Sequence, residues 1–480
     1  MTVSATDCAV RIGGAPADPI SRTPIPVTEP ATGRVIAELA GGGASDAEQA
    51  TAAATAALPG WADCPATDRA RALRRIAEDL RDPQTTATLA TLITRETGKR
   101  LAESTAEVGL SAGFFDWFAA AAETRHAELW DRVPGIRHEV TQHPLGVVAL
   151  ITPWNFPVSI PARKIAAALA AGCTVLFKPS EVAPSPALLL AGIVDRHVPG
   201  GVLCSVAGAP EAITASWLGD HRVRGMSFTG STRVGGLLAQ QAAARFLPCV
   251  LELGGNAPFL VLDDADLPAA VEMLMIAKYR NNGQSCIAAN HVWVPQDKLS
   301  EFAALYTAAS EALALGDPLT PATSLGPLAL PGDPGRIAAL ADDAAAQGAT
   351  VVRTRQPVPA EGHFCAPVIC LQPADEAAIV TGEIFGPAVS IRGYRQVDDV
   401  LEATRRLSLG LGGYVAGADT SRTAAVARQL DVGIVGVNTG TPNTPSVPFG
   451  GLKDSGLGWE GSQLGLDAFT IRRTIARAVG

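Results

Sequence analysis

Apolar positions in the middle of the chain gather in short runs that alternate with longer alanine-rich stretches. The runs, rich in Val, Ile, Leu and Phe, are typical of buried strands, and the alanine-rich stretches favour helix. A strand followed repeatedly by a helix predicts an α/β fold whose parallel sheet binds ligands at the carboxyl ends of its strands. We expect strands at Val147–Thr152, Thr174–Lys178, Val202–Ala207, Gly225–Thr229 and Val250–Leu253, and helices at Ala162–Ala171, Ala187–His197 and Ser231–Ala244.

A second region of the same kind runs from Ala257 to about Val437. It predicts a second α/β domain, and the two domains would face each other across a cleft. Its expected strands are Phe259–Leu262, His291–Val294 and Ala388–Tyr394.

The flanking segments are alanine-rich before these regions and rich in Pro, Gly and Thr after them. A Ser followed three residues later by Glu is typical of a helix start. We expect helices opened by Ser45-Asp46-Ala47-Glu48 and by Thr67-Asp68, the second ending near Asp82-Pro83, a helix and a protruding hairpin within Gly109–Arg137, a long loop at Asn438–Gly451, and a last strand at Phe469–Ala476.

Composition narrows the class of protein. A length of 480 residues with 47% hydrophobic content fits a globular protein of two or three domains. The net charge of −9 provides no broad cationic surface, which argues against nucleic acid or an anionic membrane as a partner. The eight cysteines form no C-x-x-C pair and no zinc-finger spacing, so we expect no disulfide framework, no metal and a reducing cytoplasm. No apolar run reaches the roughly 18 residues of a membrane span.

Three motifs supply a thiol, a carboxylate and an amide. Cys286 ends Gly283-Gln284-Ser285-Cys286, Glu252 ends an apolar strand, and Asn155 lies within Pro153-Trp154-Asn155-Phe156-Pro157. These groups are a nucleophile, a base and an amide donor, the parts needed to oxidise an aldehyde through a thioester. In these motifs, and over almost its whole length, the chain resembles the aldehyde dehydrogenase superfamily.

The resemblance implies a role for each catalytic residue. Cys286 attacks the carbonyl, Asn155 and the main-chain N–H of Cys286 bind the oxyanion, and Glu252 activates the water that hydrolyses the thioester. From the residues themselves, we expect the glycine-containing turn before Cys286 to expose its sulfur near amide donors that favour thiolate. Partial burial should raise the pKa of Glu252 toward useful basicity.

The resemblance also implies a fold and a proton path. The expected fold is a Rossmann-like cofactor domain with an α/β catalytic domain and a small oligomerisation element, assembled as a homodimer or homotetramer. Lys164 and Glu460 match positions that pass the proton from the base to solvent, and Trp459 stands where relatives usually carry Arg. The expected domains are residues 1–115 with 137–250 for the cofactor, 251–440 for catalysis, and 116–136 with 465–480 for oligomerisation.

Three segments match the cofactor site of the family. Phe228–Gly235 places a strand, a glycine turn and a helix start in succession, so that free amides meet a pyrophosphate. Phe177–Glu181 matches the segment on the adenosine ribose, where the carboxylate would repel a 2′-phosphate, so NAD is preferred and NADP possible. Glu383–Pro387 matches the stretch on the nicotinamide ribose. The expected cofactor residues are Trp154, Lys178, Ser180, Glu181, Gly230, Ser231, Gly235, Glu383 and Phe385.

Three segments, Arg163-Lys164, Lys278-Tyr279-Arg280 and Pro448–Gly458, make the chain resemble succinate-semialdehyde dehydrogenases most within the superfamily. In those enzymes, arginines matching Arg163 and Arg280 bind the distant carboxylate of the substrate, which implies a small-molecule semialdehyde as substrate. The alternative is that these arginines pair with protein carboxylates. The loop Ser of the family is replaced by Asn443 or Thr444, and Ala288 replaces the second Cys of a redox disulfide.

Three other functions stay open at this point. A dehydrogenase for neutral or aromatic aldehydes would have no evident use for the two arginines. An acylating dehydrogenase that passes the thioester to coenzyme A is disfavoured because such relatives commonly lack the Glu found at 252. A catalytically dead binding protein on the same fold is disfavoured by the joint presence of Cys286, Glu252 and Asn155.

Overall fold

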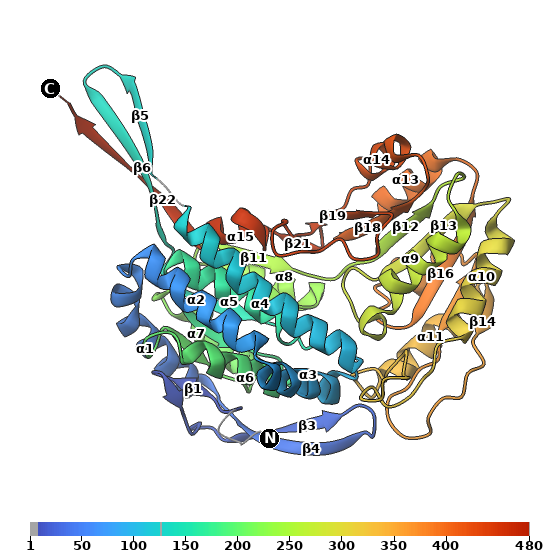
Figure 1. Cartoon of the computed structure of the whole chain (residues 1–480), viewed down its shortest axis with the longest axis horizontal. Coiled ribbons are helices and arrows are strands. Elements are labelled where there is room, and N and C mark those ends of the chain that lie inside the picture. Colours follow the sequence, from blue (N-terminus) through green and yellow to red (C-terminus); the bar gives the residue numbers. More distant parts are fainter. Residues whose placement is uncertain (1–7, 125–126, 480) are drawn as a thin grey trace.

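A sheet of eight strands forms the centre of the first lobe of this computed structural model, which describes residues 8–124 and 127–479. Its strands are β1 (Arg11–Ile12), β2 (Ala15–Pro16), β7 (Val147–Ile151), β8 (Thr174–Lys178), β9 (Leu203–Ser205), β10 (Val223–Thr229), β11 (Cys249–Glu252) and β21 (Gly456–Leu457). Their order is β2-β1-β9-β8-β7-β10-β11-β21, parallel from β9 to β11. The strand order reverses between β7 and β10, where sheets of this kind bind their ligands (Figure 1).

Strand β7 is apolar throughout because both of its faces are buried. Val148 and Leu150 belong to the core on one face, and Val147 and Ala149 belong to the core on the other. The first core is completed by α2 (Ala66–Arg81), α3 (Pro83–Thr97), α4 (Leu101–Glu123), α5 (Ser159–Ala171) and α6 (Pro184–Asp195), and the second by α1 (Ala44–Ala62) and α7 (Pro210–Gly219), while α8 (Thr232–Ala243) packs on β10 and β11.

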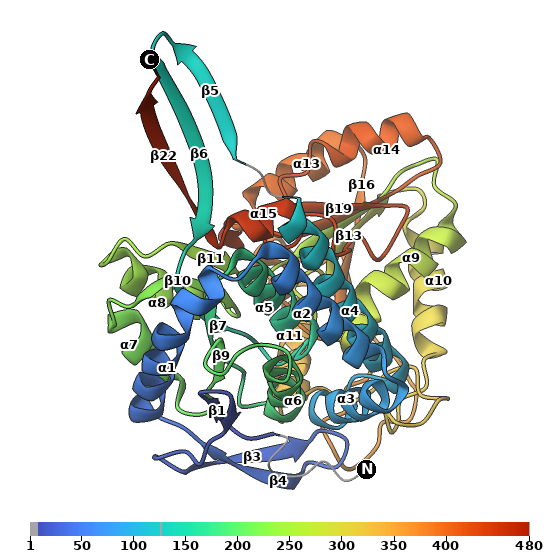
Figure 2. The same cartoon turned by 60° about the vertical axis from the view of Figure 1, so that its left-hand side comes forward.

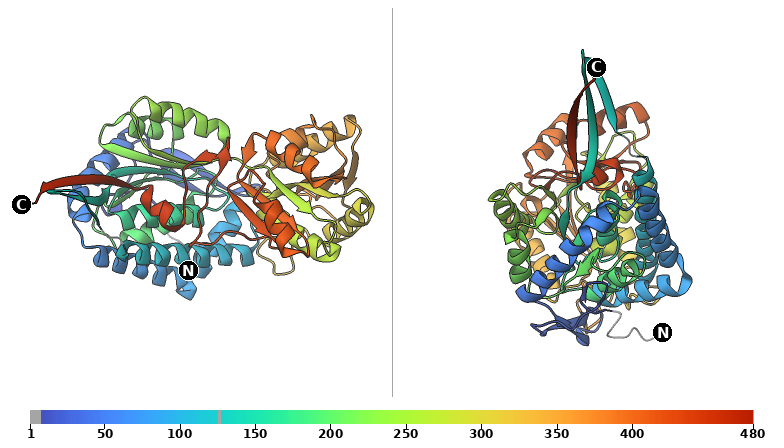
Figure 3. Two further views of the ribbon diagram at one scale, coloured as in Figure 1. Left: turned by 90° about the horizontal axis from the view of Figure 1, so that it is seen from above. Right: turned by 90° about the vertical axis from the view of Figure 1, so that its left-hand side faces the viewer.

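The second lobe has a sheet of its own. Its strands are β12 (Ala257–Val261), β13 (Ala289–Pro295), β14 (Thr350–Arg353), β15 (Val368–Leu371), β16 (Ala388–Tyr394), β18 (Gly412–Ala416) and β19 (Ile434–Val437). Their order is β14-β15-β16-β13-β12-β18-β19, and only β14 is antiparallel. The helices are α9 (Leu267–Tyr279), α10 (Leu299–Glu311), α11 (Asp333–Ala346), α12 (Ala378–Thr381), α13 (Val397–Arg406) and α14 (Thr420–Ala427). The two lobes lie side by side (Figure 3).

Three antiparallel strands project from the first lobe, away from the second (Figures 1 and 3). They are β5 (Glu128–Val133), β6 (Ile136–Pro144) and β22 (Thr470–Ala478) in the order β22-β6-β5. Leu129, Trp130 and Ile471 of these strands are exposed. Exposed apolar side chains on a projecting sheet are typical of an interface. The oligomerisation element expected from the sequence stays a prediction, which light scattering after size-exclusion chromatography would test.

The structure confirms the α/β class and both regions of alternating strands and helices, with boundaries that differ by a few residues. It also confirms the long loop after β19 and the hairpin after α4. The predicted start of the first helix is wrong: Gly43 is the N-cap of α1, and Asp46, rather than Glu48, accepts its N–H at 2.9 Å. No pattern considered above predicts the hairpin of β3 (Thr23–Glu29) and β4 (Arg34–Gly41), which crosses the base of the first lobe (Figure 2).

The remaining elements are the pair β17 (Leu409–Gly410) and β20 (Leu452–Lys453), and the short helix α15 (Ser462–Asp467) beside α4 and α5. Among the residues that the structure describes, no helix has both the length and the apolar content that crossing a membrane requires.

Candidate active site

The carboxyl ends of neighbouring strands bring the predicted site residues to one edge of the first sheet. Asn155 follows β7, Lys178 ends β8, Gly230 follows β10, and Glu252 ends β11. A cavity of about 820 Å³ lies at this edge and is also lined by Cys286 of the second lobe. The predicted catalytic residues therefore come together where the strand order reverses and the two lobes meet.

Cys286 is placed by a turn with unusual backbone conformations. The turn η1 (Arg280–Gly283) contains Asn281 and Asn282 with φ of 52° and 57°, followed by Gly283 with φ of 80°. A residue other than glycine keeps a left-handed backbone conformation only when the surrounding structure holds it there. The Asn282 amide does so by donating to the carbonyls of Gly98 and Pro327, each at 2.9 Å.

A glycine lets the segment that follows Glu252 pass close to the backbone of Cys286. A Cβ on Gly255 would lie 1.9 Å from the main-chain oxygen of Cys286, so only glycine fits at this position. Glu252, three residues earlier, has 1% of its surface exposed, and neither of its carboxylate oxygens has a hydrogen-bond partner among the described residues. A buried carboxylate without partners needs either a proton or a water molecule.

Burial and nearby charges shift the pKa values of Cys286 and Glu252, the predicted nucleophile and base. Burial raises the pKa of the Cys286 thiol to about 12, and the carboxylates of Glu383 and Glu252 add to this effect. The expected preference for thiolate is therefore not found, although Cys286 is half-buried and its residue is not fully enclosed. Burial, followed by the charge of Glu460, raises the pKa of Glu252 well above its usual value, as expected.

Asn155 is buried and held from two sides. Its side-chain nitrogen donates to the Gln284 carbonyl at 3.1 Å, which links it to the segment before Cys286. The Asn281 amide donates to the main-chain oxygen of Asn155 at 2.8 Å and to the Gln284 carbonyl at 3.0 Å. An amide has two N–H donors, so Asn155 keeps one for an oxyanion beside the sulfur.

A buried ionic cluster lies behind Glu252. Glu460 accepts hydrogen bonds from Arg163 at 2.7 Å and from Ser227 at 2.9 Å, and it also pairs with Lys164. Burial lowers the pKa of Lys164, and the charges of Lys164 and Arg163 lower the pKa of Glu460 despite its burial. Arg163 therefore pairs with a protein carboxylate, which is the alternative to substrate binding considered from the sequence.

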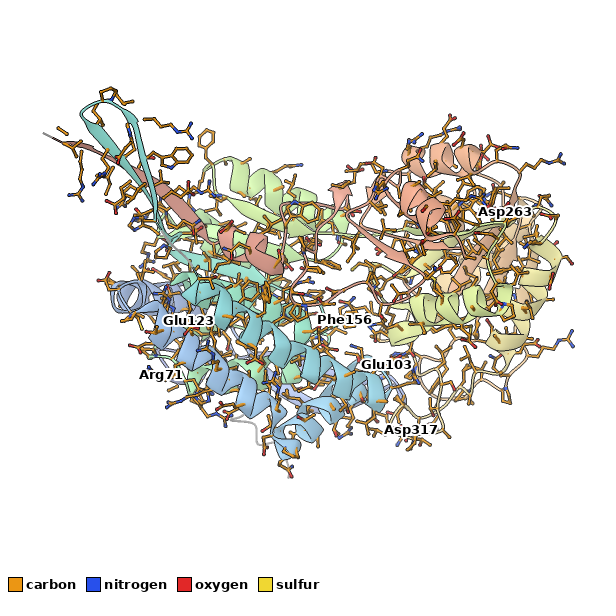
Figure 4. All side chains as sticks on the ribbon, turned by 45° about the horizontal axis from the view of Figure 1, so that its top comes forward. Arg71, Glu103, Glu123, Phe156, Asp263 and Asp317 are labelled. Carbon is orange, nitrogen blue, oxygen red and sulfur yellow. The ribbon has the colours of Figure 1, made fainter. Side chains whose placement is uncertain are left out.

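Arg280 has no such partner. Its guanidinium has no ion pair among the described residues, and it lies 5.1 Å from the ring centroid of Phe156. It lines a second cavity, of about 590 Å³, beside α4 and α9. Figure 4 shows Phe156 and Glu103, both of which line this cavity, between the two lobes.

The two loop residues expected to assist the substrate do not line that cavity; Thr441 of the same loop does. Thr444 is exposed and shares a hydrogen bond with Ser446 at 3.0 Å. Asn443 is half-buried, and its Oδ1 has no hydrogen-bond partner in the described part of the chain. The loop therefore contacts the cavity through Thr441, whereas Asn443 and Thr444 do not line its wall.

The larger cavity has the shape and groups that a dinucleotide needs. Ser231 caps α8 and accepts the Val234 N–H at 3.4 Å, so the start of this helix opens on the cavity beside Gly230. A Cβ on Gly235 would lie 2.2 Å from Leu253, so this glycine allows close packing of α8 on the sheet. Trp154, Lys178, Ser180, Glu181, Gly230, Ser231, Glu383 and Phe385 all line the cavity.

Comparison with known proteins agrees with this geometry. Residues 17–475 match the Aldehyde dehydrogenase family. The chain belongs to this family. It is 39% identical to the glutarate-semialdehyde dehydrogenase of Pseudomonas putida over 93% of this chain and 92% of that one. It is 38% identical to the NADP(+) succinate-semialdehyde dehydrogenase of Escherichia coli, again over 93% of this chain and 92% of that one. The crystal structure of succinate-semialdehyde dehydrogenase from Burkholderia pseudomallei superposes with a TM-score of 0.95 at 37% identity, over 98% of each chain.

Membership establishes an oxidoreductase that oxidises an aldehyde with NAD or NADP. Arg336 on α11 also lines the cofactor cavity of this aldehyde dehydrogenase, although it belongs to none of the motifs. It pairs with Asp333 at 3.0 Å and donates to the carbonyls of Ile384 at 2.6 Å and Phe385 at 3.1 Å. It thereby anchors the segment that carries Phe385, whose ring meets Trp154 edge to face at 5.7 Å. No motif in the sequence links Arg336 to that segment.

Proposed function

We propose that this aldehyde dehydrogenase oxidises a semialdehyde that carries a distant carboxylate, such as succinate semialdehyde, to the diacid. The observation that carries this proposal is Arg280, a guanidinium without an ion pair among the described residues, in the wall of a cavity that Phe156, the neighbour of Asn155, also lines. A partly buried cation is costly unless an anion meets it. Relatives named for glutarate and succinate semialdehydes support an anionic substrate of this kind.

The proposed mechanism uses the residues at the sheet edge. The Cys286 thiol loses its proton to solvent, and its sulfur forms a bond to the aldehyde carbon. The resulting oxyanion accepts hydrogen bonds from the Asn155 amide and the main-chain N–H of Cys286. Bound NAD(P) supplies the hydride acceptor, and the loss of hydride leaves a thioester on Cys286. Glu252 then removes a proton from water, which adds to the thioester carbon and releases the acid and the thiolate.

The proton that Glu252 takes up must leave the buried site. We assign this path to Lys164 and Glu460, because the charges of both act on Glu252. Ser227 extends the same cluster through its hydrogen bond with Glu460. Because its pKa is raised, Glu252 is protonated at low pH and cannot take a proton from water, so deacylation should accelerate as the pH rises and the carboxylate ionises.

Arg280→Ala tests the substrate. We expect the KM for an ω-carboxy aldehyde to rise about ten- to a hundredfold, because a charged hydrogen bond contributes roughly 1.5–3 kcal/mol. The KM for an uncharged aldehyde of similar length should stay within about twofold, since it has no such bond to lose. Steady-state kinetics on a matched pair of aldehydes measure both values.

The matched control for this experiment is Arg100→Ala. Arg100 lines the same cavity but already pairs with Glu103 at 2.7 Å, so its loss should affect the two aldehydes alike. The same reasoning separates Arg163, whose substitution would disturb Glu460 and slow the oxidation of both aldehydes. If Arg280→Ala weakens both aldehydes equally, the distant carboxylate is not bound there.

We propose that NAD is preferred over NADP. Glu181 lines the cofactor cavity and pairs with the buried Lys178, which holds the carboxylate near the expected adenosine ribose. Placing this carboxylate beside a 2′-phosphate should cost several-fold or more in kcat/KM. The relative from Escherichia coli is named for NADP(+), so the preference must be measured on this chain.

Glu181→Gln should raise kcat/KM for NADP by about tenfold relative to that for NAD, because the repulsion is removed while the hydrogen-bonding shape is kept. The control is Glu211→Gln, since Glu211 is a more exposed carboxylate at the same cavity and should leave the ratio unchanged. Equal kcat/KM for the two cofactors in the unmodified enzyme would refute the proposed preference.

We further propose a homodimer or homotetramer that assembles through the projecting strands, and a cytoplasmic location. The exposed apolar residues of β5 and β22 support the first. Cys64, Cys204, Cys249, Cys286, Cys365 and Cys370 are free thiols, as a reducing compartment would keep them. Neutral or aromatic aldehydes remain the alternative substrates, and turnover of these at rates equal to those of carboxylated aldehydes would favour them.

A further inference from the structure

A buried lysine outside the predicted catalytic set contacts the segment that carries Asn155. Lys99 precedes α4, and 1% of its surface is exposed. Its ammonium donates to the main-chain oxygen of Asn155 at 2.9 Å and lies 4.0 Å from the ring centroid of Phe156. It also pairs with Glu107 of α4. Every contact that the structure gives this ammonium is thus with Asn155, with its neighbour, or with Glu107.

Glu107 contacts the same segment two residues further on. One oxygen of this buried carboxylate accepts the N–H groups of Val158 at 3.0 Å and Ser159 at 3.1 Å, at the start of α5. The other oxygen pairs with Lys99. The pair therefore holds both ends of the short segment from Asn155 to Ser159, one end through its carbonyl and the other through its N–H groups.

The position of the Asn155 side chain depends on this segment. Its amide reaches the Gln284 carbonyl at 3.1 Å, and Asn281 is the other donor to its main-chain oxygen. A buried ion pair rarely stabilises a fold more than apolar packing would, so stability alone gives little reason for Lys99 and Glu107. Fixing a donor, by contrast, matters greatly, because a displacement of about 1 Å in an active site costs on the order of a hundredfold in rate.

We propose that Lys99 and Glu107 are positioning residues that hold the Asn155 amide where the oxyanion forms. Neither residue touches the reacting atoms; both act through the backbone of the Asn155 segment. The pair also lines the cavity that contains Arg280, so it lies between the proposed carboxylate site and the oxyanion site. This inference rests on the proposed role of Asn155, and the experiment below separates the two.

The experiment uses four variants of the full chain: Lys99→Met, the double variant Lys99→Met/Glu107→Gln, Asn155→Ala, and Lys99→Met combined with Asn155→Ala. The double variant removes both charges and keeps a side-chain acceptor for the start of α5, so it tests the idea even if Lys99→Met alone folds poorly. The rate of the first NADH turnover, the Kd for NAD and the Tm are measured for each variant.

Lys99→Met and the double variant should slow the first turnover about tenfold or more, with the Kd for NAD unchanged. If the lysine acts through Asn155, adding Lys99→Met to Asn155→Ala should slow the reaction by less than about twofold further, since coupled residues are not additive. A full additional tenfold loss in that background, or an unchanged rate in both Lys99 variants, overturns the proposal.

The control is Ser104→Ala on α4, the helix of Glu107, which removes a buried hydrogen bond to Thr94 of α3 without touching the Asn155 segment. It should lower the Tm and leave the first turnover unchanged. If the Lys99 variants behave in the same way, their role is structural only. If Asn155→Ala itself leaves the rate unchanged, the proposed role of Asn155 fails, and the positioning inference fails with it for a distinguishable reason.

Discussion

Cys286→Ala should abolish NADH formation from any aldehyde while NAD still binds with its normal Kd. Hydride cannot leave a planar aldehyde carbon, and the bond from sulfur is what makes that carbon tetrahedral. Alanine removes the sulfur and no other contact of the cofactor cavity, whose walls come mostly from the first lobe. Absorbance at the NADH band and calorimetric titration with NAD measure the two properties separately.

The matched control for this result is Cys249→Ala. Cys249 is also a half-buried free thiol with a raised pKa, but it lies on β11 and does not line the cofactor cavity. Its substitution should leave turnover unchanged. Appreciable NADH formation by Cys286→Ala would exclude the nucleophile assignment.

The raised pKa of Cys286 adds a dependence on pH. Because burial places this pKa at about 12, the thiolate is a small fraction near neutral pH and grows as the pH rises. The rate of the first turnover should therefore increase with pH in the unmodified enzyme. A thiol whose pKa lay below neutrality, as amide donors beside the sulfur would favour, would give a flat profile above neutral pH.

Local sequence patterns are sufficient to predict a strand where every residue of the strand is buried. Strand β8 matches its predicted bounds because five successive buried residues leave no alternative register. The start of α1 was missed because two acidic residues compete for the capping position, and the choice of Asp46 depends on a contact with the distant Ile20 N–H as well as with Gly43. Propensity does not contain such contacts.

The parts of the site that cannot be predicted from the sequence also depend on contacts between residues far apart in the chain. The motifs placed Cys286, Asn155 and Glu252 near one cavity because each follows a short local pattern. The partner of Arg163 could not be deduced, since Glu460 lies 297 positions away and any buried acid would have served. The role of Lys99 cannot be deduced from the sequence, because it depends on a hydrogen bond to a carbonyl 56 positions further along the chain.

Glu252→Gln should leave a rapid first turnover of NADH and then slow the steady state by about a hundredfold or more, the usual contribution of a general base. Glutamine keeps the size of the side chain but cannot take a proton from water, so the thioester on Cys286 accumulates. Stopped-flow absorbance would show the burst, and mass spectrometry of the quenched protein would show the acyl group on Cys286.

The rate of deacylation should also depend on pH, in a direction set by the raised pKa of Glu252. Because burial and Glu460 raise the pKa of Glu252, deacylation in the unmodified enzyme should accelerate as the pH rises through that pKa, and Glu252→Gln should lose this limb. The matched control is Glu96→Gln, since Glu96 is another buried carboxyl, with its pKa raised to about 8, that accepts the Ser185 N–H and does not line the cofactor cavity. An unchanged steady-state rate in Glu252→Gln would remove this residue from the mechanism, whereas loss of the burst itself would show that it also takes the proton of Cys286.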